Sequence, residues 1–169
     1  MTKDEKGFDT RAIHAGQKND PVTGAVMTPI YATSTYAQES PGVHKGYEYS
    51  RTSNPTRKAL EDCISSLENG DQGFAFASGM AAIFSTFGAL LSSGDHILSA
   101  RSVFGSTHSL FTKFFPKWNI ETTYFNISDA DTIESLIQPN TKILYAETPT
   151  NPGLEVLDME FLGALCKKH

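Results

Sequence analysis

A serine and a glycine, Ser78 and Gly79, stand where an apolar run gives way to a helical pattern. Residues 73–77 are small or aromatic, which predicts a short strand buried on both faces, and apolar residues then recur at helical spacing from Met80 to Leu91. A helix that begins here presents free backbone N–H groups and the positive end of its dipole. Gly79 lets a ligand come close and Ser78 adds a hydroxyl, so the stretch predicts a phosphate site. The alternative is an ordinary strand-to-helix turn in which Ser78 is only the N-cap.

A second residue suited to phosphate is Arg51, which follows Tyr49 in the approach to another predicted helix. That helix, over residues 55–67, has Asn54 as its N-cap before a proline, and Gly70 is expected to stop it. A guanidinium can bind a phosphate through two parallel hydrogen bonds. The alternative is a solvated arginine, the usual state of a lone arginine in a loop.

The elements that must position these residues alternate along the chain. Strands are expected over residues 96–100, 120–125 and 142–146, and helices over residues 105–115 before Pro116, over 129–137, and after Asp158 as a cap. This alternation with short loops indicates an α/β domain with a mostly parallel sheet and helices on both faces. Such sheets bind ligands outside the carboxyl ends of their strands, where the segments around Ser78, Phe104 and Asn151 fall.

Residues 1–50 have little periodicity and are rich in glycine and proline. The aromatic and β-branched residues at 30–36 argue against disorder. A long segment without a core of its own is unusual in a compact domain, so residues 1–50 are predicted to be an arm that contacts a partner subunit. Residues 51–169 would then form the α/β domain.

Composition excludes several classes of function. The chain of 169 residues has 14 Lys and Arg against 19 Asp and Glu, without a basic run, which argues against nucleic acid as a partner. No apolar segment is long enough to cross a membrane, no signal peptide opens the chain and no metal site is expected. Cys63 and Cys166 occupy apolar positions in helical patterns, which predicts reduced core thiols in a cytoplasmic protein.

Five motifs occur in register over nearly the whole chain: Thr10-Arg11-Ala12-Ile13-His14-Ala15-Gly16, Thr28-Pro29-Ile30-Tyr31, Tyr49-Ser50-Arg51 with Asn54-Pro55-Thr56, Ala77-Ser78-Gly79-Met80-Ala81-Ala82, and Glu147-Thr148-Pro149-Thr150-Asn151-Pro152. Each is weak alone, but five in register are specific. Together they resemble the N-terminal part of the Cys/Met-metabolism family of pyridoxal-phosphate enzymes. That family includes cystathionine synthases and lyases, methionine lyase and O-acylhomoserine sulfhydrylases. The implied fold is the large domain of fold-type-I pyridoxal-phosphate enzymes, truncated, with an extended N-terminal arm.

The resemblance implies pyridoxal 5′-phosphate as the cofactor. Ser78, Gly79 and Met80 would hold its phosphate at the helix start. Tyr49 and Arg51 would reach the same phosphate in the neighbouring subunit's site, which implies a homo-oligomer, a homotetramer in this family.

Two further residues are assigned to the cofactor on the same ground. Asn151 would hydrogen-bond the phenolic oxygen and tune the electron sink. Phe104 would stack over the pyridine ring, where many family members have a tyrosine. The missing phenol removes an acid, base or leaving-group role of that oxygen and argues against an efficient lyase. We associate it with the homoserine-ester sulfhydrylase branch, and we assign no role to Glu147.

A second departure concerns catalysis. The family's Schiff-base lysine, and the aspartate that pairs with the pyridine nitrogen, are expected beyond His169, so no catalytic residue is predicted within this chain. We therefore expect the chain to be the N-terminal part of a longer enzyme or a truncated gene product, inactive by itself.

Several hypotheses about function stay open at this point. The first is an enzyme of trans-sulfuration and methionine biosynthesis that acts at the γ-carbon of homoserine esters or cystathionine-like amino acids with a sulfur donor. It would be an O-acylhomoserine sulfhydrylase or a cystathionine γ-synthase. A cystathionine or methionine γ-lyase of the same family is the alternative. A third possibility is an inactive fragment that acts only by pairing with an intact subunit. A nucleotide-binding domain is also conceivable, but both the dinucleotide fingerprint and the Walker lysine loop are lacking.

Overall fold

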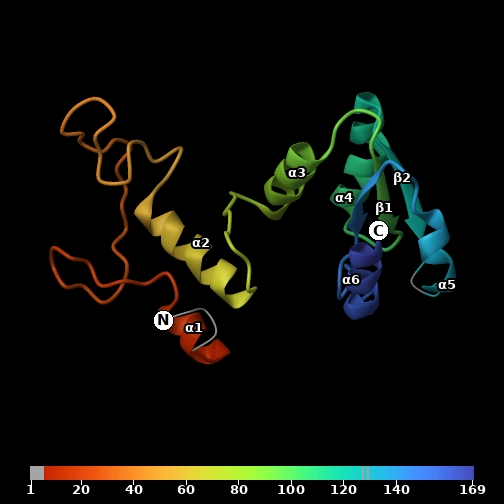
Figure 1. Cartoon of the computed structure of the whole chain (residues 1–169), viewed down its shortest axis with the longest axis horizontal. Coiled ribbons are helices and arrows are strands. Elements are labelled where there is room, and N and C mark those ends of the chain that lie inside the picture. Colours follow the sequence, from red (N-terminus) through yellow and green to blue (C-terminus); the bar gives the residue numbers. More distant parts are fainter. Residues whose placement is uncertain (1–5, 127, 129) are drawn as a thin grey trace. The chain divides into compact units, whose positions relative to one another are not determined.

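The computed structural model describes residues 6–126, 128 and 130–169. The chain divides into two compact units, Met1–Phe76 and Ala77–His169, which are described separately (Figure 1). Contacts within the chain thus place the division after Phe76. The boundary predicted at residue 50 concerns contact with a partner subunit and stays a prediction.

The first unit contains two helices, α1 (Phe8–His14) and α2 (Pro55–Leu67), joined by a long irregular segment. The Arg11 guanidinium on α1 donates to the Ser66 carbonyl and, at 2.9 Å, to the Asn69 side chain. These acceptors lie at the carboxyl end of α2, where the helix dipole is negative. Gly16 follows with a φ of 75°, and a Cβ there would lie 2.2 Å from the Ala59 carbonyl oxygen. This close approach explains why the position is a glycine.

The beginning of α2 fastens the irregular segment. The Asn54 side chain accepts the N–H groups of Thr56 and Arg57, as predicted for an N-cap, and donates to the Tyr31 carbonyl at 2.9 Å. The Thr56 hydroxyl donates to the Pro29 carbonyl at 2.9 Å and accepts the Tyr31 N–H at 2.9 Å. Two of the sequence motifs therefore contact each other through side-chain bonds to backbone rather than through regular structure, which is why this part of the chain lacks periodicity.

The end of α2 differs from the prediction. Asn69, not Gly70, takes the left-handed conformation, with a φ of 54°. The Gly70 N–H donates to the Ser65 carbonyl at 2.8 Å, and the Asn69 N–H donates to the Ser66 carbonyl at 3.3 Å. These two bonds form a Schellman motif, in which asparagine is the usual substitute for glycine.

The strand predicted over residues 73–77 is wrong for this structure. Within the described residues the segment is irregular and joins no sheet, and Phe74 and Phe76 are 69% and 45% exposed. A strand exists only where a neighbour supplies ladder hydrogen bonds. Here the N–H of Ala75 donates instead to the Glu61 carboxylate at 3.1 Å.

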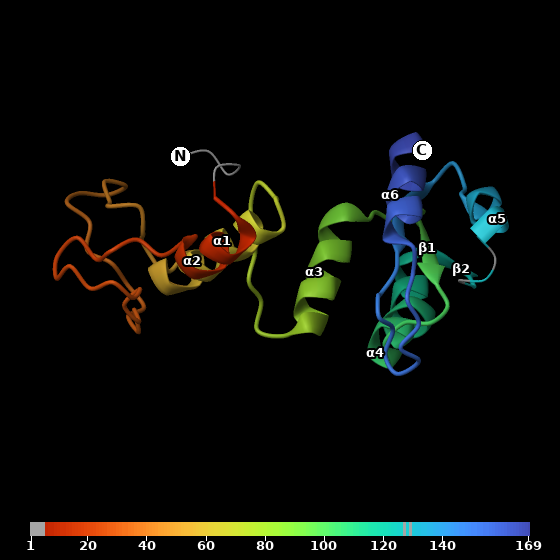
Figure 2. The same ribbon diagram turned by 90° about the horizontal axis from the view of Figure 1, so that it is seen from below.

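The second unit is built on a parallel sheet of three strands, β1 (His96–Ala100), β2 (Glu121–Phe125) and β3 (Thr141–Tyr145), in the order β2-β1-β3. Figure 2 labels β1 and β2 in this unit. The predicted strands are confirmed: β1 has the predicted bounds, β2 begins one residue later, and β3 lies one residue earlier. The central strand β1 is buried along its whole length. The α/β class with a parallel sheet is therefore confirmed.

Helices cover both faces of this sheet because neighbouring residues of β1 point to opposite sides. Leu98 and Ala100 pack in one core with Ile133, Leu162 and Leu165. Ile97 packs in the other with Phe87, Leu110, Phe111 and Phe115. The first core lies under α5 (Ala130–Ile133), η5 (Glu134–Leu136) and α6 (Met159–Lys168). The second lies under α3 (Gly79–Leu90), η2 (Leu110–Phe114) and η3 (Phe115–Trp118), and α4 (Gly105–Ser109) directly precedes η2. The start predicted for a helix at Asp129 lies outside the described residues.

The single helix predicted before Pro116 is instead three short pieces. The α-helical α4 passes into the π-helical η2 and then into the 3-10 turn η3, which contains Pro116. Proline has no N–H to continue the α-helical pattern, and its ring crowds the carbonyl four residues earlier. Asn119, with a φ of 57°, closes the last turn.

A histidine joins the three strands at their amino-terminal end. The buried His96 of β1 is 2.8 Å from the Thr141 hydroxyl of β3 through Nδ1, and 2.9 Å from the Thr123 hydroxyl of β2 through Nε2. Burial lowers the pKa of His96, and the Glu121 carboxylate opposes this only in part. The ring is therefore held neutral, in hydrogen bonds that a neutral imidazole can make.

The prediction of two core cysteines is wrong for Cys166, which is exposed, whereas Cys63 is partly buried. On α6 the buried side chains are Leu162 and Leu165, and the next residue along a helix turns about 100° away from the core. The predicted cap of α6 is confirmed, since Asp158 accepts the Phe161 N–H at 2.9 Å. Among the described residues, no helix is long and apolar enough to cross a membrane, and no group of three or more His, Cys, Asp or Glu is arranged to hold a metal ion.

Candidate functional site

The amino-terminal end of α3 has the features that bind small anions. The Ser78 hydroxyl oxygen accepts the Ala81 N–H at 3.1 Å, and the Ser78 carbonyl accepts the Ala82 N–H at 3.0 Å. In the described part of the chain, no acceptor takes the N–H groups of Gly79 and Met80. No atom lies within 4 Å of the position that a Cβ of Gly79 would occupy. Two free amides, a hydroxyl proton and open space thus coincide at a helix start, and a phosphate fits there.

A buried aromatic residue holds α3 against the sheet. Phe87 is 2% exposed and packs with its ring edge-on to Phe111, at 5.2 Å between centroids. It also meets Phe115 at 5.6 Å and Tyr145 at 5.5 Å. Of all residues in α3, only Phe87 is buried, so it determines where the helix start lies within this unit.

Met80 connects the start of α3 to α4. Its sulfur accepts a hydrogen bond from the Thr107 hydroxyl at 3.9 Å, and Thr107 is fully buried in α4. The Met80 side chain also packs against the core that contains Phe87 and Phe111. The side chain therefore has a packing role, and only the backbone N–H of Met80 is available to an anion.

Phe104 stands at the N-cap position of α4, just beyond the carboxyl end of β1, with 41% of its surface exposed. Its backbone N–H donates to Glu147 Oε2 at 2.9 Å. The other oxygen of Glu147 accepts the Tyr145 hydroxyl at 2.9 Å. Burial, together with this bond to Glu147, raises the pKa of Tyr145 to about 12. The carboxylate of Glu147 therefore holds the backbone of Phe104 near the end of β3 and leaves the aromatic ring accessible.

Asn151 lies in the loop between β3 and α6, and its side chain is exposed. Its neighbour Thr150 is buried and gives this loop its form. The Thr150 N–H donates to the Glu155 carbonyl at 3.0 Å, while the Thr150 hydroxyl accepts the Glu155 N–H at 3.0 Å. A Cβ at Gly153 would lie 3.3 Å from that hydroxyl oxygen. The loop thus packs tightly on Thr150 and presents the Asn151 amide to solvent.

Tyr49 and Arg51 lie together in the first unit. The Arg51 guanidinium carbon is 5.2 Å from the centroid of the Tyr49 ring, a cation–π contact. The Tyr49 carbonyl accepts the N–H groups of Thr52 and Ser53, both at 3.1 Å. Both Tyr49 and Arg51 are exposed, so each is available to a ligand or a partner.

The predicted site residues thus form two groups: Tyr49 with Arg51 in the first unit, and Ser78, Gly79, Met80, Phe104 and Asn151 in the second. Sequence reasoning missed Glu147 as the residue that holds Phe104, and Thr107 as the partner of Met80. A carboxylate directly after a predicted strand was a usable signal for Glu147. Nothing in the sequence pointed to Thr107.

Residues 9–169 match the model of the family described as Cys/Met metabolism PLP-dependent enzyme. The chain belongs to this family. The predicted family and cofactor are therefore confirmed, and the cofactor is pyridoxal 5′-phosphate.

Similar proteins are known in several bacteria. A cystathionine beta-lyase of Coxiella burnetii is 48% identical over 95% of this chain, and a cystathionine gamma-lyase of Bacillus subtilis is 47% identical over 94%. The crystal structure of metB from Corynebacterium glutamicum has a TM-score of 0.94 at 40% identity and covers 99% of this chain. The chain spans only 42% of the length of each of the two curated relatives, and 44% of the chain in that crystal structure. It corresponds to the N-terminal part of these proteins.

Proposed function

We propose that the intact protein is a pyridoxal-phosphate-dependent enzyme of trans-sulfuration that acts at the γ-carbon of an activated homoserine. A sulfur nucleophile, sulfide or cysteine, would replace the ester group, which makes the enzyme an O-acylhomoserine sulfhydrylase or a cystathionine γ-synthase. Curated relatives named cystathionine gamma-synthase match this chain, one of them with 44% identity over 96% of it. The observation that carries the choice of replacement over cleavage is Phe104, which has no phenol.

The residues of this chain would bind and orient the cofactor. The N–H groups of Gly79 and Met80, with the Ser78 hydroxyl, would hold the phosphate dianion at the positive end of α3. The exposed ring of Phe104 would stack on the pyridine ring, and the Asn151 amide would donate to the phenolic oxygen. The bound cofactor supplies an electron sink for negative charge at the substrate's Cα.

Tyr49 and Arg51 would complete the phosphate site of a neighbouring subunit. The guanidinium has donors left for a bidentate contact, and the Tyr49 ring supports it from one side. The active form would then be a homo-oligomer, a homotetramer by the family resemblance, located in the cytoplasm. The 169-residue chain without the rest of its protein would be inactive, because the Schiff-base lysine is expected after His169.

A γ-lyase is the second candidate, and the identity of 47% to the cystathionine gamma-lyase of Bacillus subtilis favours it. The two reactions share the cofactor and differ in what completes the turnover. In a lyase, the γ-carbon takes up a proton instead of a sulfur nucleophile, and water hydrolyses the resulting imine, so the products are a 2-oxo acid and ammonia.

Substrate assays on the intact protein decide between the two. We expect O-acetyl- or O-succinylhomoserine with sulfide to give homocysteine, or with cysteine to give cystathionine, at a kcat/KM well above that for cystathionine cleavage. A faster release of 2-oxobutanoate and cysteine from cystathionine would reject the replacement reaction and support the γ-lyase. If the protein turns over none of these substrates but co-purifies with an intact homologue, pairing alone would be its role.

A further inference from the structure

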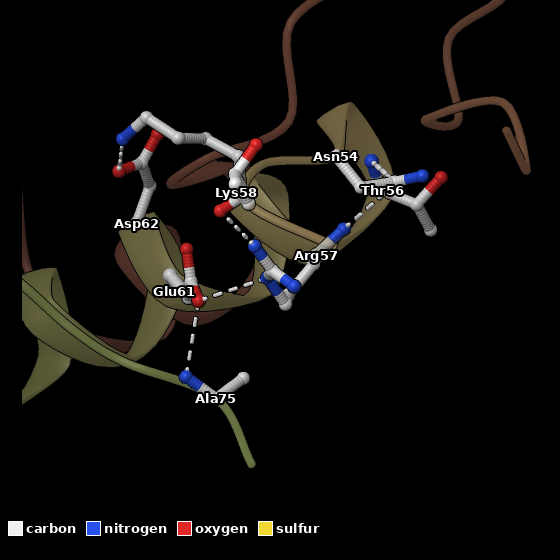
Figure 3. A network of polar contacts seen from close by, with 8 residues as sticks. Asn54, Thr56, Arg57, Lys58, Glu61, Asp62 and Ala75 are labelled. Atoms are coloured by element: carbon white, nitrogen blue, oxygen red, sulfur yellow. Dashed lines mark hydrogen bonds and ion pairs between the residues drawn. The ribbon is translucent and has the colours of Figure 1, made fainter. Parts of the chain in front are cut away.

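An ion pair on α2 connects two segments that lie more than twenty residues apart in the sequence. The Glu61 Oε1 atom is 3.3 Å from the Nε of Arg57 and accepts the Ala75 N–H at 3.1 Å (Figure 3). The Arg57 guanidinium also donates, through Nη2, to the Thr52 carbonyl at 2.6 Å. One arginine–glutamate pair thus binds the backbone at Thr52 and the backbone at Ala75 to the same helix.

Both of these backbone positions adjoin predicted phosphate contacts. Thr52 directly follows Arg51, and Ala75 stands three residues before Ser78. The contact at the second segment is close, because a Cβ at Gly73 would lie 2.4 Å from the Glu61 carbonyl oxygen. The segment that contains Gly73 and Ala75 therefore packs closely against α2 within the first unit.

Glu61 is the better shielded member of the pair. The Glu61 side chain is 17% exposed and the Arg57 side chain 34% exposed. A hydrogen bond to a charged and partly buried group is stronger than one at the surface, where solvent competes. The two backbone segments are thus held by charge-assisted bonds, of which the one to Ala75 is partly buried and the one to Thr52 is exposed.

We propose that Arg57 and Glu61 are positioning residues of the cofactor site. Arg57 sets the loop whose arginine reaches the phosphate in a partner's site, and Glu61 sets the segment that leads to the phosphate site of its own subunit. This proposal rests on the proposed function, which assigns Arg51 and Ser78 to the phosphate. It adds that one pair on one helix prepares both halves of a composite site. Without the pair, these segments must become ordered when the cofactor binds, which lowers the apparent affinity in proportion to the fraction already ordered.

The same helix offers a matched control. Lys58 and Asp62 form an ion pair at the same spacing, with 2.5 Å between Nζ and Oδ1 (Figure 3). Their side chains are 53% and 46% exposed, and in the described part of the chain neither is hydrogen-bonded to residues 49–53 or 73–78. Loss of this pair removes a helix ion pair but leaves both segments in place.

The test is the affinity of the intact, cofactor-free protein for pyridoxal phosphate, measured by absorbance titration in four variants. If about a tenth of the cofactor-free variant molecules keep the two segments ordered, Glu61→Ala and Arg57→Lys should each raise the Kd about tenfold. Lysine fails because it cannot contact Glu61 and the Thr52 carbonyl with one planar fork. Glu61→Gln keeps an oxygen for the Ala75 N–H and should restore most of the affinity, and Asp62→Ala should leave the Kd unchanged. Amide exchange at residues 49–53 and 73–78 should rise in the order of the Kd values.

Equal Kd values for Glu61→Ala, Arg57→Lys and Asp62→Ala, in a protein whose wild type binds the cofactor, would overturn the positioning role and leave the proposed function intact. A wild type that does not bind pyridoxal phosphate would instead overturn the proposed function itself. If Glu61→Ala does not fold, the comparison of Arg57→Lys with Asp62→Ala makes the same decision.

Discussion

Replacing Phe87 by alanine tests whether the start of α3 is placed by one buried ring. Full burial of a phenylalanine side chain contributes about 1.5–3 kcal/mol. Edge-to-face contacts with other rings add about 0.5–1.5 kcal/mol each, and Phe87 makes two of them, with Phe111 and Phe115, besides a tilted contact with Tyr145. With partial relaxation of the cavity, Phe87→Ala should lower the free energy of unfolding by about 3–5 kcal/mol.

Phe84 is the control for this substitution, since it is the same residue type on the same helix. It is 38% exposed and meets Phe114 and Trp118 at 5.7 Å, so Phe84→Ala should cost only about 1–2 kcal/mol. Denaturant unfolding can be followed by circular dichroism and by the fluorescence of Trp118, the only tryptophan of this chain. A cost for Phe87→Ala no larger than that for Phe84→Ala would refute the reasoning.

Three further predictions follow from the site and the sheet. Gly79→Ala should leave the unfolding free energy unchanged or raise it by about 0.5–1 kcal/mol. The same change should weaken pyridoxal-phosphate binding, because the added methyl group fills the open space beside the free amides. Unchanged affinity would place the phosphate elsewhere. Burial lowers the pKa of His96 below its ordinary 6.5, so below that pH the unfolded chain binds a proton that the folded chain does not. The free energy of unfolding should therefore be highest above pH 6.5 and should fall below it by up to about 1.4 kcal/mol per pH unit. Urea titrations at several pH values should show that His96→Gln removes this slope. Glu147→Ala should lower the free energy of unfolding by about 1.5–3 kcal/mol, since it leaves the Phe104 N–H and the Tyr145 hydroxyl without their acceptor. Glu147→Gln should lower it less. Equal losses for the two variants in denaturant unfolding would contradict the role of this carboxylate.

The features that the sequence predicted well are those with local causes. Asn54 and Asp158 cap their helices through bonds to residues two or three positions ahead. The three strands are short runs that contain β-branched, aromatic or aliphatic residues and lie between turn residues, and such runs are visible without knowledge of the fold.

The features that it predicted badly depend on partners distant in sequence. The run at residues 73–77 has the composition of a strand, but pairing requires a neighbouring strand that composition does not reveal. Cys166 was wrongly predicted to be buried because the sequence pattern suggests a wider apolar face than the helix buries in the structure. For the site, family resemblance supplied the residue types, while the contacts of Glu147 and Thr107 required coordinates. The cofactor roles of the seven named residues stay predictions.

The way in which Phe104 is held has an evolutionary consequence. Its position is fixed through the main-chain amide, which any residue other than proline supplies, so nothing in the tether to Glu147 depends on the ring. Phenylalanine and tyrosine codons differ at a single nucleotide. One point mutation can therefore add or remove a hydroxyl on this ring without disturbing the scaffold. If the ring stacks on the cofactor as proposed, a lineage could cross between elimination and substitution chemistry in one step.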